Sequence, residues 1–197
     1  MKRPTQTGGF TLIETLVAIS ILTLTMAAPF YAIEQSITAA DVSRDELTGS
    51  NLAQEGVEYV RAIRDGNYLF VRSNPGSTQS WMFRLDGTGV STTNCFAPNF
   101  CSVDANPAAS SAIVSYPSAA SILPLNITNI SYLYTQQTNG GVTPTPFTRT
   151  LQLSCTAAGP CVPSAAQEVE VTVTVKWITR NIPYTTTITE YLDNWLP

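Results

Sequence analysis

The apolar run near the N-terminus constrains the fold more than any other feature of this sequence. Between Phe10 and Ile33, Glu14 is the only charged residue. As an α-helix the run would be roughly 36 Å long, which exceeds the hydrocarbon core of a bilayer at about 30 Å. We therefore expect a membrane-spanning helix. Glu14 needs a separate explanation, because a carboxylate inside the membrane costs about 2–3 kcal/mol on insertion scales and a plain anchor has no reason to keep it.

The charges around this run predict its orientation. Lys2 and Arg3 precede it, and no acidic residue lies between them and the run. Because positive charge favours the cytoplasmic side, the N-terminus should stay inside and the chain after Ile33 should be exported. A removed secretory signal is the ordinary alternative. The early charge at Glu14 and the imperfect cleavage sequence at residues 26–28 argue against it.

The residues at the start of the run carry a family resemblance. The stretch Gly8-Gly9-Phe10-Thr11-Leu12-Ile13-Glu14, after a short basic leader, closely resembles the N-terminal signature of type IV pilins and type II secretion pseudopilins. The resemblance implies that a prepilin peptidase removes residues 1–9 by cutting between Gly9 and Phe10 on the cytoplasmic side. The new amino group of Phe10 would then be N-methylated, and the apolar helix would stay in the mature protein.

The resemblance also implies a role for Glu14 and a set of partners. In fibres of the family, this carboxylate is expected to meet the N-terminal amine of a neighbouring subunit. Because pairing relieves part of the desolvation cost, Glu14 would set the axial register of assembly. A pair with the amine of its own chain is the alternative. The implied partners are other pilin or pseudopilin subunits, prepilin peptidase, an inner-membrane assembly platform and, before assembly, cytoplasmic membrane lipid.

Helical spacing continues beyond the membrane segment, residues 10–33, into an amphipathic segment, residues 34–65. Pro29 predicts a kink or local melting, and Gly49-Ser50 allows an interruption. An apolar stripe between Leu52 and Ile63 predicts a face packed against a sheet.

A stop signal and a second resemblance mark the end of this segment. Arg64-Asp65-Gly66-Asn67 indicates the C-terminus of the helix, with a basic last turn followed by glycine. The stretch from Leu52 to Asp65 is similar to the second half of the helix in many minor pilin-like proteins. That similarity predicts a minor subunit.

Residues 66–197 are expected to form an exported, β-rich globular domain. Glu168–Ile178 alternates apolar and polar residues, and Thr179-Arg180-Asn181 indicates a turn into Ile182–Glu190, so these segments predict an antiparallel hairpin. A third alternating strand is predicted at Phe147–Leu153. The weaker strand candidates are Tyr68–Val71, Trp81–Leu85, Ala112–Tyr116 and Ile130–Thr135. The pattern predicts an α+β domain in which the helix packs on an antiparallel sheet. The resemblance implies the same pilin-like fold, with the second half of a long N-terminal helix across the sheet.

The four cysteines form two closely spaced pairs, Cys95/Cys101 and Cys155/Cys161. Two local disulfides in an oxidising compartment are the favoured interpretation, and an exported domain agrees with it. A four-thiolate zinc site formed by two converging loops and free buried thiols are the alternatives. Pilins of the family often have one disulfide around a C-terminal loop region, so the two short-range pairs leave the subfamily open.

Catalytic machinery is not expected. The chain has no His, which excludes Ser-His-Asp and Cys-His arrangements and His-ligated metals, and it has no Gly-x-Gly-x-x-Gly or phosphate-binding loop. Asp86-Gly87-Thr88-Gly89 resembles an aspartic-protease motif, but the chain holds no second copy. We therefore expect no enzyme activity, no cofactor and no metal. The net charge of −4 without a basic run argues against a nucleic-acid partner.

Together these features predict a structural minor pilin or pseudopilin subunit that assembles through its N-terminal helix into a type IV pilus or a type II secretion pseudopilus. We expect a single-pass protein of the cytoplasmic membrane with its N-terminus inside, which then joins a periplasmic or cell-surface fibre. The alternative is a single-pass membrane-anchored extracellular binding module that does not polymerise.

Overall fold

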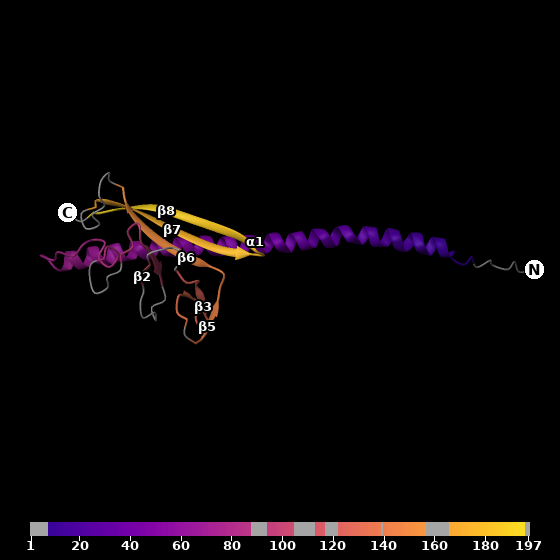
Figure 1. Cartoon of the computed structure of the whole chain (residues 1–197), viewed down its shortest axis with the longest axis horizontal. Coiled ribbons are helices and arrows are strands. Elements are labelled where there is room, and N and C mark those ends of the chain that lie inside the picture. Colours follow the sequence, from indigo (N-terminus) through magenta and orange to yellow (C-terminus); the bar gives the residue numbers. More distant parts are fainter. Residues whose placement is uncertain are drawn as a thin grey trace, which may run out of the picture. The chain divides into compact units, whose positions relative to one another are not determined.

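The computed structural model describes residues 8–87, 94–104, 113–116, 122–138, 140–156 and 166–195 (Figure 1). Their helix and strands are α1 Leu12–Ser73, β1 Phe100–Val103, β2 Ile113–Tyr116, β3 Asn126–Thr128, β4 Tyr134–Thr135, β5 Val142–Pro144, β6 Thr148–Cys155, β7 Glu168–Thr179 and β8 Ile182–Asp193. One antiparallel sheet has the strand order β2-β1-β6-β7-β8, and a smaller antiparallel sheet has the order β4-β3-β5.

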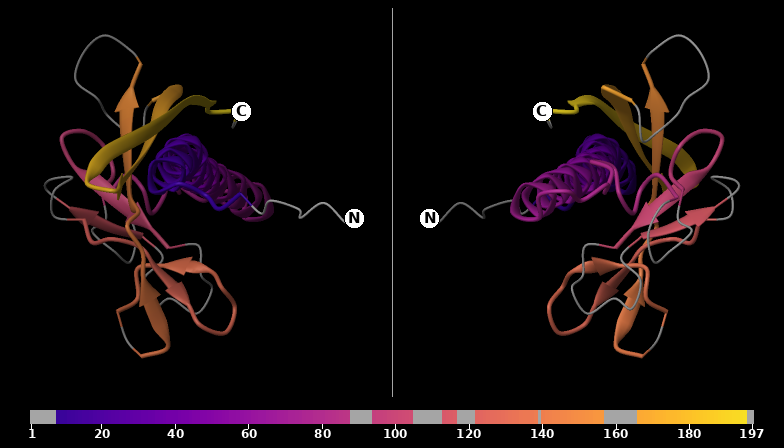
Figure 2. Two further views of the ribbon diagram at one scale, coloured as in Figure 1. Left: turned by 90° about the vertical axis from the view of Figure 1, so that its right-hand side faces the viewer. Right: turned by 90° about the vertical axis from the view of Figure 1, so that its left-hand side faces the viewer.

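The chain divides into two compact units, Met1–Arg44 and Asp45–Pro197, and α1 contributes residues to both. In the second unit the helix packs on one face of the five-stranded sheet. Figure 2 shows the strands of this unit gathered along one side of the helix. The predicted α+β fold, with a long N-terminal helix on an antiparallel sheet, is therefore confirmed.

Helix α1 runs without a break through Pro29. The local melting predicted there is not observed, because a proline removes a single backbone donor and the helical bonds on either side can remain. The apolar segment and the residues that follow it therefore belong to one helix.

The predicted helix end at Arg64–Asn67 is wrong, since α1 continues to Ser73. There the side chains of Ser73 and Asn74 donate to main-chain carbonyls of the last turns, at 2.9 Å and 2.8 Å. These side-chain bonds reinforce the last turns, where the Phe70 carbonyl also accepts the Asn74 amide at 3.0 Å. The strand predicted at Tyr68–Val71 is also wrong, because these residues form part of the last two turns of α1.

The helix is continuous at Gly49-Ser50, where the sequence allowed an interruption. The packing of α1 on β7 explains the glycine. Gly49 and Gly56 are buried where α1 meets β7. A Cβ atom built on Gly49 would lie 2.7 Å from Cζ3 of Trp177, and one on Gly56 would lie 2.9 Å from Cγ1 of Val173. Glycine at these positions therefore lets the helix approach the strand closely.

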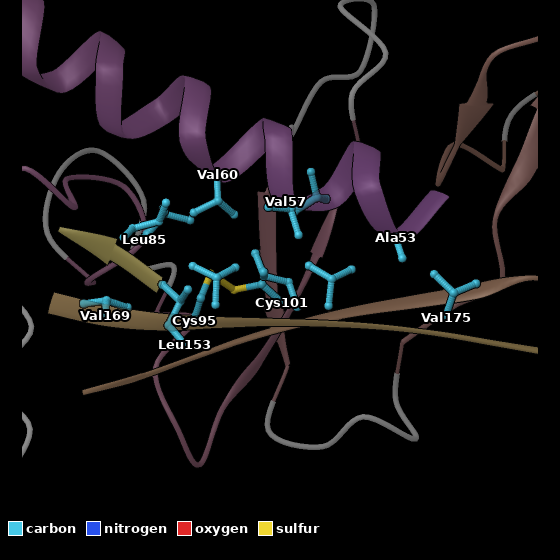
Figure 3. Packing of buried hydrophobic residues seen from close by; sticks show 14 of the residues in the cluster. Ala53, Val57, Val60, Leu85, Cys95, Cys101, Leu153, Val169 and Val175 are labelled. Carbon is cyan, nitrogen blue, oxygen red and sulfur yellow. A yellow bond between two sulfur atoms is a disulfide. The ribbon is translucent and has the colours of Figure 1, made fainter. Parts of the chain in front are cut away.

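The core lies between α1 and the five-stranded sheet. Ala53, Val57 and Val60 of the helix face Leu153 of β6 and the inward valines of β7 (Figure 3). The inward side chains of β7 are nearly inaccessible to solvent, and they are Val169, Val171, Val173, Val175 and Trp177. The apolar stripe predicted on the helix is therefore the face that packs on the sheet.

The predicted hairpin is observed as β7 and β8. The two strands pair along their whole length, from Glu168 opposite Asp193 to Thr179 opposite Ile182. The turn consists of Arg180 and Asn181, whose φ angles are 50° and 65°. Positive φ at both central residues is typical of the turn that matches the twist of a two-residue hairpin.

Of the other predicted strands, two are confirmed, one is confirmed in part and one is wrong. Strand β6 corresponds to the predicted Phe147–Leu153, and β2 to the predicted Ala112–Tyr116, although Ala112 lies outside the described residues. Of the predicted Ile130–Thr135, the final two residues form β4. Trp81–Leu85 forms turns instead of a strand, with the amide of Leu85 bonded to the carbonyl of Met82 at 2.9 Å. Trp81, Met82 and Leu85 are buried all the same, which explains the misleading pattern.

A buried arginine joins three elements of the core. Arg149 of β6 is 1% exposed, and its guanidinium donates to the carbonyls of Leu52 at 3.0 Å and Val103 at 2.6 Å. It also donates to the carboxylate of Glu55 at 2.8 Å. The side chain therefore fastens α1 to β1 and β6, a contact that the strand alternation does not predict.

One of the two predicted cysteine pairs is described in full. Cys95 and Cys101 form a disulfide, and both residues are completely buried in the core. Cys155 is also disulfide-bonded, but its predicted partner Cys161 lies outside the described residues, so that pairing stays a prediction. The bond leaves no free thiolate at Cys95 or Cys101 to ligate zinc.

Candidate functional sites

The N-terminal site begins with an ordered helix start. Thr11 precedes α1, and the amide of Glu14 approaches its hydroxyl oxygen at 3.4 Å and bonds to its carbonyl at 3.1 Å. Thr11 and Glu14 therefore occupy the first and fourth positions of a Thr-x-x-Glu capping box. The positive end of the helix dipole also favours a carboxylate in the first turn. This local role of Thr11 was readable from the sequence and is missing from the sequence predictions.

The predicted processing residues lie just before this start. Gly8 and Gly9 are exposed and non-helical, and a Cβ atom on either would meet nothing within 4 Å. Phe10 is 80% exposed. The Gly9–Phe10 bond is therefore accessible in this structure. Cleavage at that bond and methylation of Phe10 stay predictions.

The apolar side chains from Phe10 to Ile37 are exposed. An 18-residue window of α1 is long and apolar enough to cross a membrane, and none of it is buried. The four Ser and Thr hydroxyls between Leu12 and Phe30 each donate to a carbonyl three or four residues earlier, at 2.8–2.9 Å. These hydroxyls meet their hydrogen-bonding needs inside the helix, as polar groups in a membrane span must.

Glu14 is the exception among the polar side chains of that stretch. It forms no ion pair with any described residue. Its carboxylate therefore differs from the neighbouring hydroxyls, because the helix supplies the hydroxyls with acceptors and leaves the carboxylate without a cation.

Residues 5–28 match the family model of the prokaryotic N-terminal methylation motif. The chain carries the pilin-type N-terminal signature. This signature indicates a pilin-like protein that is processed by prepilin peptidase and that interacts, in general, with that peptidase and with other pilins. Together with the exposed apolar helix, it indicates membrane anchoring followed by a surface fibre. The comparisons with curated proteins and with solved structures gave no match.

The second unit carries ion pairs outside the pilin-type signature. Arg61 of α1 pairs with Glu58 on its own helix and with Glu190 of β8. The hydrogen bond to Glu190 raises the pKa of Arg61. Among the residues described, no three His, Cys, Asp or Glu side chains gather as a metal site would require. The ion pairs of Arg61 therefore have a structural role, because they join the edge strand β8 to the helix.

An open groove of about 530 Å³ lies along the C-terminal part of α1. We call it the Gly66 groove, and it is lined by Tyr59, Ala62, Ile63, Gly66, Asn67, Phe70, Gln79, Phe83 and Arg84. Burial raises the pKa of the Tyr59 phenol, and the Arg84 charge opposes this. Asn67 is fully engaged, since it donates to the carbonyls of Trp81 and Phe83 and accepts from Gln79. The groove is therefore mainly apolar, with one cation at its rim.

Proposed function

We propose that this chain is a structural minor subunit of a type IV pilus or a type II secretion pseudopilus. Prepilin peptidase cuts it after Gly9, the amine of Phe10 is N-methylated, and residues 10–33 hold it in the cytoplasmic membrane. The inner-membrane assembly platform then transfers it into the fibre. The observation that carries the proposal is the exposed apolar helix of the matched motif, in which Glu14 alone among the Ser, Thr and Glu side chains has no partner supplied by its helix.

The physical argument for assembly rests on the cost of a lone carboxylate. Removal of residues 1–9 creates a positive amine at Phe10, four residues before Glu14. In a bundle of apolar helices the dielectric constant is low, so an unpaired carboxylate is strongly disfavoured and a neighbouring amine relieves that cost. Axial staggers that leave Glu14 without an amine are thereby penalised. The carboxylate selects the register, and the apolar side chains supply the packing.

Transfer from membrane to fibre follows from the same helix. Its apolar side chains contact lipid before assembly and other apolar helices afterwards, so extraction does not expose them to water. The internally bonded hydroxyls of Thr15 and Ser20 are suited to both surroundings, because they need no external partner.

The mature N-terminus tests the proposal directly. We expect intact-mass and peptide mass spectrometry of the purified protein to show a chain that begins at Phe10 and carries one methyl group on its amine. A chain that retains Met1, or that begins near Ala28, would contradict the proposal and support a protein outside the pilin pathway.

One feature favours a second candidate function, a membrane-anchored binding module. The loop between β3 and β4 exposes Ile130 and Tyr132, which are 94% and 74% exposed. The hydroxyl of Thr128 accepts a hydrogen bond from the Leu133 amide at 3.0 Å across this loop. Exposed apolar residues that lie close together are typical of recognition surfaces. Absence of the chain from sheared fibres, together with an unprocessed N-terminus, would favour this function over assembly.

A further inference from the structure

Gly66 differs from the other glycines in the middle of α1. Glycine inside a helix costs about 0.5–1 kcal/mol relative to alanine. Gly49 and Gly56 have a reason to be glycine, because Trp177 and Val173 contact them directly. A Cβ atom on Gly66 would meet nothing within 4 Å. The floor of the Gly66 groove therefore has room for a side chain from another molecule. The ring of Trp177 occupies the corresponding space over Gly49.

The rim of the groove supplies a charge. Arg84 is exposed and forms no ion pair with any residue that the structure describes. Its φ angle of 76° is uncommon for a residue with a side chain. An apolar floor with a free guanidinium at its edge fits an aromatic side chain that has a carboxylate close by.

The chain itself carries such a group on the opposite flank of α1. Trp195 is 57% exposed, and its ring lies 5.6 Å from the ring of Tyr68 and 4.6 Å from the guanidinium carbon of Arg64. Asp193, two residues earlier, is exposed and has no ion pair within the described chain. We call these two residues the Trp195 patch. Arg64 lies beside this patch and pairs with Asp65 at 2.9 Å, so its positive charge is neutralised there.

The helix geometry relates the groove to the patch. At 3.6 residues per turn, Gly66 points about half a turn away from Arg64 and Tyr68, while its height along the axis differs by only about 3 Å. When two copies stand side by side with parallel helices, one flank of the first faces the opposite flank of the second. The groove of one copy then faces the Trp195 patch of the next at the same height.

We propose that the Gly66 groove binds the Trp195 patch of a second copy of this chain. Trp195 fills the apolar floor over Gly66, and Asp193 pairs with Arg84. The contact is head-to-tail, so it can join more than two copies. It needs parallel helices, which insertion in one membrane supplies. In that respect it rests on the proposed membrane insertion, and it requires neither cleavage at Gly9 nor a fibre.

Photo-crosslinking of the full-length chain in lipid nanodiscs tests the contact. Trp195 is replaced by p-benzoylphenylalanine, and equal amounts of ¹⁴N- and ¹⁵N-labelled chains are reconstituted together at several copies per disc. After illumination we expect mixed-isotope cross-links whose acceptor peptides contain residues 59–70 or 79–84. Two outcomes would overturn the proposal. In the first, no cross-link joins a ¹⁴N-labelled chain to a ¹⁵N-labelled chain. In the second, the mixed-isotope cross-links map to other residues of the second copy.

Variants separate this contact from chance proximity in the disc. Gly66→Leu fills the floor and should lower the mixed cross-link about tenfold, whereas Gly140→Leu, also at a glycine with open space, should leave it unchanged. Arg84→Asp and Asp193→Arg should each weaken it, and their combination in one chain should restore it. Insensitivity to Gly66→Leu, or no recovery in the combined variant, contradicts the proposed pairing. Unchanged processing at Gly9 in these variants keeps the result distinct from the proposed function.

Discussion

Glu14 has two environments to consider, the first turn of its own helix and a bundle of neighbouring helices in an assembly. Locally, it lies in the first turn of α1 at the positive end of the helix dipole, which favours its negative charge. The dipole does not provide a full counter-charge in an apolar bundle. The amine released at Phe10 can provide one, so the residue is suited to signal correct alignment of neighbouring helices.

Glu14→Ala should leave membrane insertion intact and strongly reduce incorporation into fibres, because the apolar run remains and the register charge is lost. Immunoblots of membrane and sheared-fibre fractions measure both quantities. Glu34→Ala is the matched control, since this exposed helix carboxylate lies beyond the membrane segment, and it should incorporate normally. Equal incorporation of the two variants contradicts the register role.

Arg149 and Glu55 predict an asymmetric effect on stability. Arg149→Met removes the buried guanidinium bonds to the carbonyls of Leu52 and Val103 together with the ion pair to Glu55, so it should lower the free energy of unfolding by roughly 1–3 kcal/mol. Glu55 is 38% exposed on its side chain, so Glu55→Gln should cost less. Denaturant unfolding of the full chain in detergent measures the two free energies. A loss for Glu55→Gln as large as that for Arg149→Met would show that the ion pair, and not the carbonyl contacts, dominates.

At the scale of an element, α1 combines a membrane segment with a packed face, and its glycines distinguish the two kinds of surface. Those that contact β7 are required by close approach, whereas Gly66 lies over open space. Similar residues in one helix therefore have opposite expected responses to the same substitution.

Gly49→Ala should destabilise the protein by about 1–3 kcal/mol, because the new methyl group overlaps the Trp177 ring. Gly66→Ala should stabilise it by about 0.5–1 kcal/mol through helix propensity. Thermal unfolding followed by circular dichroism gives the sign of each change. A stabilising Gly49→Ala would mean that Trp177 moves aside easily and that the close approach is not a constraint.

At the scale of the whole molecule, the hydrophobic core belongs to one unit. Among the residues that the structure describes, the buried apolar side chains lie after Asp45, from Leu52 to Leu192. A fragment comprising Asp45–Pro197 should therefore fold without the membrane segment and remain soluble. Its unfolding temperature should lie within a few degrees of that of the full chain in detergent. Aggregation, or loss of cooperative unfolding in the fragment, would show that residues before Asp45 are needed for stability.

Much of the architecture was predictable from local pattern. The hairpin of β7 and β8 followed from alternation on both sides of a short turn, and the N-terminal signature from residues that are adjacent in the chain. Strands β1, β3 and β5 were missed because they are three or four residues long, too short to show an alternating pattern. Trp81–Leu85 was misread because burial in turns and burial in a strand leave similar apolar patterns.

The membrane helix, the pilin-type signature and the alternating strands are encoded in neighbouring residues, since hydrophobic spacing and cap chemistry act over a few positions. The role of Gly49 under Trp177, the three-way contact of Arg149 and the open floor at Gly66 have no local signal. Each depends on which residues the fold brings together across distant segments. Contacts of that kind arise from packing, and they become visible once the helix lies on the sheet.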